Sequence, residues 1–314
     1  MNNENKKIVF VLIAVLAIIV GGYASLISYT GMSTPFSVVM SQSMQHDNER
    51  SEIGCIDTGD IMIVKNKANA TIQSYVVGTS TGYSMFGDYG SVIIYERNAN
   101  SNPVIHRAIV WLDWDSKNET WSSEELKDYK GEWYCSNGGI QDDDCNNLHG
   151  TLTFKNLTQS KKTVSINLNS LTKKSGYLTL GDNPKTNMSF DQASGIINHA
   201  IGYEDIRSVP IAEVPWLGTI KLLLNGNSTN LSYVPNSLPS LAMSIVTIIG
   251  ALFLIDIAFQ WRSLIGWKSG KNGEDSEERG VRPPHPSIST GTRNSKQGLF
   301  QGQEKPCPKI WKQG

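Results

Sequence analysis

The sequence has no aspartate, glutamate, lysine or arginine between residues 8 and 46. The first part of this stretch, 8–29, is apolar throughout, and a helix needs about 20 such residues to cross a bilayer. A second apolar run covers 238–259 and holds one charge, Asp256, which lies close enough to its end to reach the membrane interface. The sequence therefore predicts transmembrane helices at 8–29 and 238–260.

The chain also has little net charge, −1 in 314 residues, and more acidic than basic residues between the two apolar runs. We therefore expect no nucleic-acid partner. Basic residues flank both runs on the terminal side: Lys6, Lys7, Arg262, Lys268 and Lys271. The positive-inside rule then places 1–7 and 261–314 in the cytoplasm and 30–237 outside. A cleavable signal peptide is the alternative reading of the N-terminal run.

Cysteine is scarce, with four residues in the chain. Cys135 and Cys145 bracket a short polar segment and could form a local disulfide outside the cell, although separate thiols fit the sequence equally well. Cys55 would then be an unpaired external thiol. No His-x-x-x-His or Cys-x-x-Cys spacing occurs, so we predict neither a metal site nor a cofactor. Six Asn-x-Ser/Thr sequons all lie between the apolar runs, which supports an external location: Asn69, Asn118, Asn156, Asn187, Asn227 and Asn230.

Strand signals dominate the region between the runs. Six segments are rich in β-branched and aromatic residues and are mostly bounded by turn formers: 60–64, 91–96, 103–112, 150–157, 163–168 and 177–180. Only 191–202 has a helical pattern. The prediction is a mainly β protein, with an external antiparallel β-domain between two membrane helices. Within that domain 66–88 and 113–175 have the character of insertions, and the tail 261–314 has a disordered composition.

Candidate catalytic residues begin with Ser43, in the Ser41-Gln42-Ser43-Met44 segment just beyond the first apolar run. A serine becomes a nucleophile only when a neighbouring base takes its proton. His46 is close in sequence, but catalytic groups are assembled from separate elements, and His106 lies within a predicted strand that would hold it rigidly.

A third member of such a site would be a carboxylate. Asp182 lies in a Gly-Asp-Asn-Pro turn, and Asp191 precedes the segment with the helical pattern, where it could be an N-cap. Serine, histidine and aspartate are common residues, so residue types alone do not identify a hydrolase.

Taken together, four segments resemble type I signal peptidases of the archaeal and endoplasmic-reticulum branch. They are "VVMSQSM" (38–44), "TGDIMIVK" (58–65), "GSVIIYERNANSNPVIHRAI" (90–109), and "YLTLGDNP" (177–184) with its downstream Asp-Gln. A fifth, weaker match is "EVPWLGTIKL" (213–222), which is similar to a Pro-aromatic-x-Gly strand late in that fold. The segments cover about a third of the chain and occur in the family's order.

The resemblance implies a signal-peptidase β-domain and a role for each matching residue. Ser43 would be the nucleophile and His106 the general base. Asp191 would orient the histidine and Asp182 would support the site, although the two aspartates are farther apart than is usual in the family. The Ser41 hydroxyl and the Ser43 backbone N–H would form the oxyanion hole.

The implied activity is removal of signal peptides from secretory preproteins at the outer face of the membrane. The implied partners are preproteins, the lipid bilayer and the protein-export translocon. The protein would be a multi-pass protein of an archaeal cell membrane, or of the endoplasmic reticulum in a eukaryote. Two alternatives come from other classes. One is a non-catalytic binding ectodomain with a peptidase-like fold, and the other is a metal-dependent hydrolase.

Overall fold

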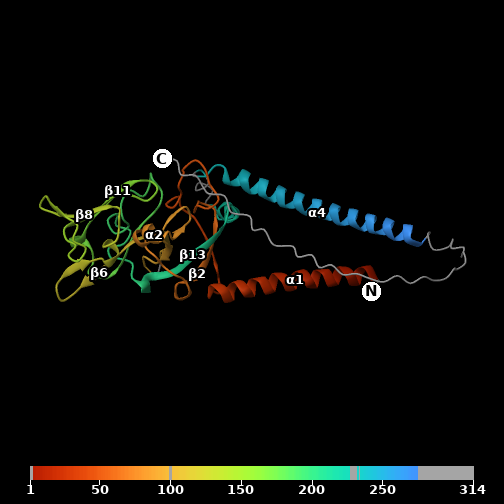
Figure 1. Cartoon of the computed structure of the whole chain (residues 1–314), viewed down its shortest axis with the longest axis horizontal. Helices are drawn as coiled ribbons and strands as arrows, with labels where there is room; N and C mark the ends of the chain where they lie inside the picture. Colours follow the sequence, from red (N-terminus) through yellow and green to blue (C-terminus); the bar gives the residue numbers. More distant parts are fainter. Residues whose placement is uncertain (1–2, 99–100, 227–231, 233, 275–314) are drawn as a thin grey trace, which may run out of the picture. The chain divides into compact units, whose positions relative to one another are not determined.

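The computed structural model describes residues 3–98, 101–226, 232 and 234–274. Over these residues the protein is mainly antiparallel β, with one long apolar helix near each end, which confirms that part of the predicted fold (Figure 1). The predicted tail beyond residue 274 and the sequons at Asn227 and Asn230 lie outside the described residues.

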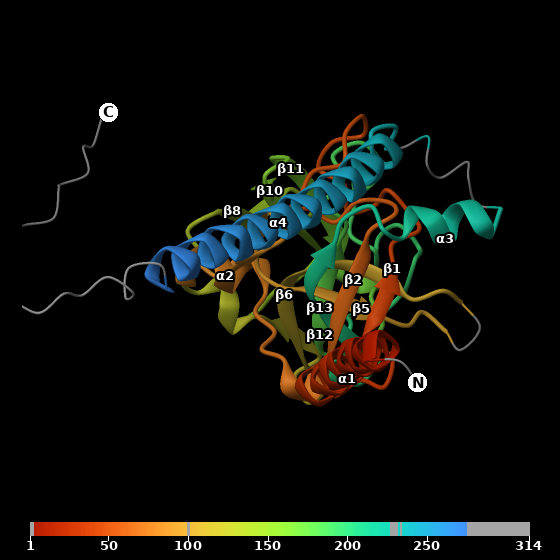
Figure 2. The same ribbon diagram turned by 90° about the vertical axis from the view of Figure 1, so that its right-hand side faces the viewer.

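The main sheet runs in the order β1-β2-β13-β5-β6-β12, with β7 paired to the far end of β6 (Figure 2). All of its pairs are antiparallel. Its strands are β1 (Phe36–Val38), β2 (Ile61–Asn66), β5 (Val92–Tyr95), β6 (Val104–Asp115), β7 (Thr120–Ser122), β12 (Gly176–Leu180) and β13 (Ile206–Val214). The long strand β6 lies between β5 and β12, so a side chain on it is held from both sides.

The predicted insertion at 113–175 folds as a second antiparallel sheet, in the order β11-β10-β8-β9. Its strands are β8 (Glu132–Asn137), β9 (Ile140–Asp142), β10 (Thr151–Leu157) and β11 (Lys162–Asn167). Inward-facing residues of this sheet, such as Leu152 and Phe154, share one hydrophobic core with Ile109 and Leu178 of the main sheet. Burial of this apolar surface makes the second sheet an integral layer of the domain.

The other predicted insertion, 66–88, is short and ordered. It holds the helix α2 (Tyr75–Thr81) and a small hairpin formed by β3 (Ser84–Met85) and β4 (Asp88–Tyr89). Four single 3-10 turns complete the elements before the last helices: Lys67–Asn69, Glu124–Leu126, Leu168–Ser170 and Tyr203–Asp205. The Ser74 side chain caps α2 by accepting from the Val77 N–H, as expected for an N-cap serine.

Two helices are long and apolar enough to cross a membrane. They are α1 (Asn3–Thr30), with a candidate span at Val9–Thr30, and α4 (Ser237–Glu274), with a candidate span at Ser237–Trp261. The end of α1 is packed against the domain, since Tyr23 stacks on Phe36 and the Lys65 ammonium lies over the Tyr29 ring. Only residues 31–35 lie between the end of this apolar helix and β1.

Several local predictions were wrong. Residues 191–202 form turns rather than a helix, because their N–H groups bond back to Phe190 and Asp191. The segment 213–222 is not one strand: β13 ends at Val214 and the short helix α3 (Thr219–Leu224) follows. The helix α4 continues to Glu274, beyond the predicted start of the tail at 261.

Of the two readings of Cys135 and Cys145, the structure has separate thiols, since both cysteines are free. Cys135 is buried in β8, and the β8–β9 hairpin places Asp142 opposite it rather than Cys145. Burial raises the pKa of the Cys135 thiol to about 11, which makes that thiol unreactive.

Candidate active site

The segment that carries Ser43 is an extension of the edge strand β1. After β1 the chain stays beside the next loop, with the Val39 N–H donating to Asp60 and the Gly59 N–H donating to Val39. Met44 then anchors the turn because its side chain is buried in the core with Val92 and Ile94. This anchor holds Ser43 at the surface of the domain, where its Oγ lies 3.3 Å from the Oγ of Ser41.

His106 lies near the start of β6, opposite Ile93 of β5. Its Nδ1 is 2.8 and 2.7 Å from the two carboxylate oxygens of Asp191, and the two side chains are 3% and 0% exposed. Asp191 is brought there by the chain beyond β12, where its N–H donates to the Thr179 carbonyl. The structure thus pairs His106 with Asp191, the second of the two candidate aspartates.

Tyr95 of β5 completes this buried group. Its hydroxyl donates to Asp191 Oδ2 at 2.7 Å. Burial and the adjacent Asp191 carboxylate raise the pKa of Tyr95 well above its ordinary value, so the phenol stays protonated and remains a donor. With Nδ1–H given to the carboxylate, the neutral histidine has Nε2 available to accept a proton.

Ser43 and His106 line the same cleft, which has a volume of about 620 Å³. Its apolar walls come from β1, from the loop after it and from the start of β6. Within the described residues Ser43 Oγ hydrogen-bonds to Ser41 and not to His106. His106 Nε2 lies 3.5 Å from Asn187 Nδ2. Catalytic hydrogen bonds are often long in free enzymes and shorten when substrate binds.

Asp182 occupies a different position. Side chains alternate along β6, so Arg107 faces away from the His106 side. The Arg107 guanidinium meets Asp182, with Nε–Oδ1 at 2.9 Å and Nη2–Oδ2 at 2.5 Å. Burial alone would raise the pKa of Asp182, but Arg107 and His46 hold it well below its ordinary value. The pair is fully buried, and Arg107 Nη1 also donates to main-chain carbonyls of residues 85–90.

The loop after β12 is attached to the serine segment on one side. The Asn183 N–H donates to the Ser43 carbonyl at 3.0 Å, and its side chain donates to the Gln42 carbonyl at 2.7 Å. Gly181 allows this close approach, because a Cβ there would lie 2.5 Å from the Ser43 carbonyl oxygen. The position of Ser43 therefore depends on this loop.

The second sheet supports the same loop from the other side. The Lys162 ammonium, buried at the start of β11, donates to the carbonyls of Gly181, Asp182 and Asn183 at 2.9, 3.2 and 2.8 Å. Burial lowers the pKa of Lys162 to about 8, so the ammonium is still mostly protonated at neutral pH. No pattern in the sequence indicated this role, because Lys162 lies in the segment predicted as an insertion.

Replacing Lys162 by methionine is expected to destabilise the domain by about 2–4 kcal/mol, because three buried carbonyls lose their shared donor while the side-chain volume is kept. The matched control is Lys127→Met, which removes only an exposed ion pair with Glu124. Equal thermal unfolding temperatures for the two variants would show that the Lys162 contacts contribute nothing.

Asp60, in the Gly-Asp strand segment, is buried and accepts from the N–H groups of Asp57 and Trp216. Burial raises its pKa from 3.8 to about 7. Between pH 4 and pH 7 the Asp60 carboxyl is protonated in the folded protein and ionised in the unfolded chain. The stability that the protonated, buried Asp60 contributes is therefore lost as pH rises from about 4 to about 7.

The expected result is that Asp60→Asn removes part of the pH dependence of unfolding. The window from about pH 5 to the folded pKa of about 7 spans two pH units, and two units correspond to roughly 3 kcal/mol. The free energy of unfolding of wild type, relative to that of Asp60→Asn, should therefore fall by up to this amount between about pH 5 and about pH 8. Thermal unfolding of both proteins across this range measures the difference. A difference that stays constant with pH would contradict the raised pKa.

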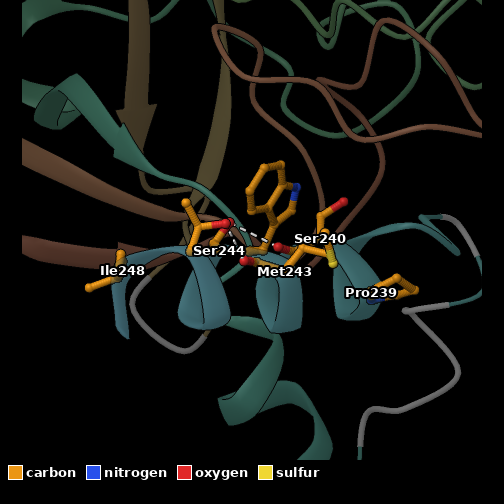
Figure 3. Close-up of a pocket in the computed structure, with 7 residues that line it drawn as sticks. Pro239, Ser240, Met243, Ser244 and Ile248 are labelled. Carbon is orange, nitrogen blue, oxygen red and sulfur yellow. Dashed lines mark hydrogen bonds between the residues drawn. The ribbon is translucent and has the colours of Figure 1, made fainter. Parts of the chain in front are cut away.

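A second pocket lies where α4 begins (Figure 3). It has a volume of about 540 Å³, and Ser240, Met243 and Ile248 of α4 face it together with Trp216. The Ser244 hydroxyl donates to the Ser240 carbonyl within the helix. None of the described residues that line this pocket is titratable, so the pocket offers no base to activate its serine and threonine hydroxyls.

The structure thus brings Ser41, Ser43 and His106 to one cleft and joins Asp191 to His106, while Asp182 binds Arg107. The sequence did not single out the supporting residues Tyr95, Arg107, Lys162, Asn183 and Asn187. Among the described residues no cluster of three or more His, Cys, Asp or Glu could hold a metal ion. No protein-family model matches this chain, and no curated protein matches it.

Proposed function

We propose that this protein is a membrane-bound serine endopeptidase that removes signal peptides from exported preproteins. The observation that carries the proposal is the buried His106–Asp191 pair, whose histidine shares an apolar cleft with Ser43. In this role His106 Nε2 takes the Ser43 proton as Ser43 attacks the scissile carbonyl, and Asp191 stabilises the imidazolium. In this proposal Asp182 supports the loop after β12 and is not the third member of the catalytic triad.

The oxyanion formed in the attack would be stabilised by the Ser43 N–H and the Ser41 hydroxyl. The two serine Oγ atoms are 3.3 Å apart, so Ser41 lies beside the reacting centre. A single donor of this kind contributes on the order of 3 kcal/mol to transition-state stabilisation in other enzymes.

The form of the cleft supports a peptide substrate. The strand β1 is the terminal strand of the main sheet, and its outer edge can pair with an extended segment. The neighbouring walls include Val38, Ile61 and Ile105, which offer apolar contacts to small side chains. An extended segment ending in small residues precedes the cleavage point of secretory signal peptides.

The position of the serine segment supports a substrate located in the membrane. Only residues 31–35 separate α1 from β1, and β1 leads directly to Ser43. With α1 and α4 both spanning the bilayer and the β-domain outside, Ser43 would lie near the outer membrane surface. The preprotein, the bilayer and the export translocon are the partners of this proposal.

The test is cleavage of a preprotein with an Ala-x-Ala signal sequence by the full chain in detergent micelles. The expected product begins immediately after the second alanine, as read by N-terminal mass analysis. Replacing both alanines by leucine in the substrate should abolish cleavage if the cleft selects small residues. If the preprotein binds but is not cut, the cleft is a peptide-binding groove and the protein is a binding ectodomain.

A further inference from the structure

A second group of nucleophile, base and carboxylate lies outside the cleft. The Cys55 Sγ is 3.1 Å from His46 Nδ1, and His46 Nε2 is 3.4 Å from Asp182 Oδ2. The three residues come from separate loops: the turn after the Ser43 segment, the loop before β2 and the loop after β12. His46 is therefore not a base for Ser43, and it joins a thiol to a buried carboxylate.

We infer that Cys55 is an activated thiol, held by His46 and Asp182, that undergoes thiol–disulfide exchange with small soluble disulfides. The arrangement has the order that nucleophilic catalysis requires: a thiol, an imidazole within hydrogen-bonding distance, and a carboxylate on the far nitrogen that orients the ring. The inference does not depend on the function proposed for Ser43.

The electrostatics of the group favour a protonated His46 imidazole beside the Cys55 sulfur. Burial lowers the pKa of His46, but the hydrogen bonds and charges of Asp182 and Cys55 outweigh burial and raise it to about 10. The other charged groups facing this cluster are Asp57, which also acts on His46, and Arg107, which donates to both oxygens of Asp182, including the one that His46 approaches. A cationic imidazole stabilises a neighbouring thiolate, which is the reactive form of cysteine.

The thiol is also reachable from solvent. Cys55 is half-buried and follows residues 52–54, which are exposed. Gly54 has no neighbouring heavy atom where a Cβ would stand, so the approach along this loop is open. On the inner side Gly87 makes room for the pair, because a Cβ there would lie 2.7 Å from His46 Cε1 and 3.4 Å from Cys55 Sγ.

The reaction is balanced without a further oxidant. The Cys55 sulfur attacks one sulfur of a disulfide R–S–S–R, forming the Cys55–S–S–R mixed disulfide and breaking the original S–S bond. The thiol proton, held on His46, passes to the departing R–S⁻, which leaves as R–SH. Attack by a second thiol on the mixed disulfide restores Cys55.

The test uses oxidised glutathione and the full chain in detergent micelles, with mixed disulfides quantified by peptide mass spectrometry after acid quench. An ordinary cysteine is only about 3% thiolate at pH 7. Because the thiolate is the attacking form, a thiol whose proton is accepted by a hydrogen-bonded imidazole is expected to react about tenfold faster than an ordinary thiol. Cys145, also half-buried, is the comparator in the same chain.

The expected result is that Cys55 reacts about tenfold faster than Cys145 and that His46→Gln removes this difference. His149→Gln is the matched control, because His149 contacts Asp142 rather than Cys55. The inference is overturned if Cys55 reacts no faster than Cys145, or if His46→Gln retains the fast reaction.

The comparison of Cys55 with Cys145 in the wild-type chain needs no variant. It therefore still decides the question if His46→Gln does not fold, which exposure of the buried Cys135 would reveal. Equal rates for the two wild-type thiols would overturn the inference.

Discussion

Ser43→Ala is expected to lower the rate of preprotein cleavage by about 10⁴-fold or more, because the variant lacks the hydroxyl that attacks the scissile carbonyl. The measurement is the cleavage rate under single-turnover conditions in micelles. Thermal unfolding should be unchanged, because the Ser43 side chain bonds only to Ser41 within the described residues.

Ser41→Ala is the matched control for this result, since it removes a hydroxyl two residues away. Loss of one oxyanion donor lowers rates by about 10²–10³-fold in other enzymes, so Ser41→Ala should be impaired but measurably active. The reverse order, with Ser41→Ala the more impaired variant, would assign the nucleophile to Ser41.

Asp191→Asn is expected to lower the cleavage rate by about 10⁴-fold, because the amide no longer fixes the tautomer of His106. The fold should change little. Asn keeps the size of the side chain and can still accept from the Tyr95 hydroxyl, whose bond to Asp191 is 2.7 Å. The measurement is again single-turnover cleavage, together with thermal unfolding.

Asp182→Asn is the contrasting variant. It leaves the Arg107 guanidinium, 0% exposed, without its counter-ion, and breaking a buried pair on one side costs about 3–5 kcal/mol. We expect a large loss of stability and, at temperatures where the protein stays folded, a smaller loss of activity than for Asp191→Asn. If Asp182→Asn lost more activity while remaining stable, Asp182 would belong to the catalytic group.

The sequence predicts the strands that are regular and whose side chains face a hydrophobic core. β5, β10 and β12 have the alternating or continuous apolar pattern that burial produces. The central strand β13 was missed, because it contains Pro210 along with Arg207 and Glu213. The register shift between Pro210 and Ala212 accommodates the proline, which lacks an N–H, and such a shift depends on the neighbouring strands.

Residue types alone predicted the members of the candidate site but not their pairing, and only the family resemblance assigned Asp191 to His106. Nothing in the spacing of Asp182 and Asp191 tells which of them meets His106. The pairing depends on His106 and Arg107 facing opposite sides of β6, and on the path of the loop after β12 between them. The structure also gave His46 a partner, Cys55, that the sequence did not suggest.

The most direct test of the account is the cleavage rate of Ser43→Ala, His106→Ala and the double variant with the same preprotein. Residues that act as one catalytic unit are strongly non-additive. The account predicts that each single variant loses about 10⁴-fold or more and that the double variant is no slower than either. Losses that multiply in the double variant, or cleavage by Ser43→Ala at the wild-type rate, would contradict it.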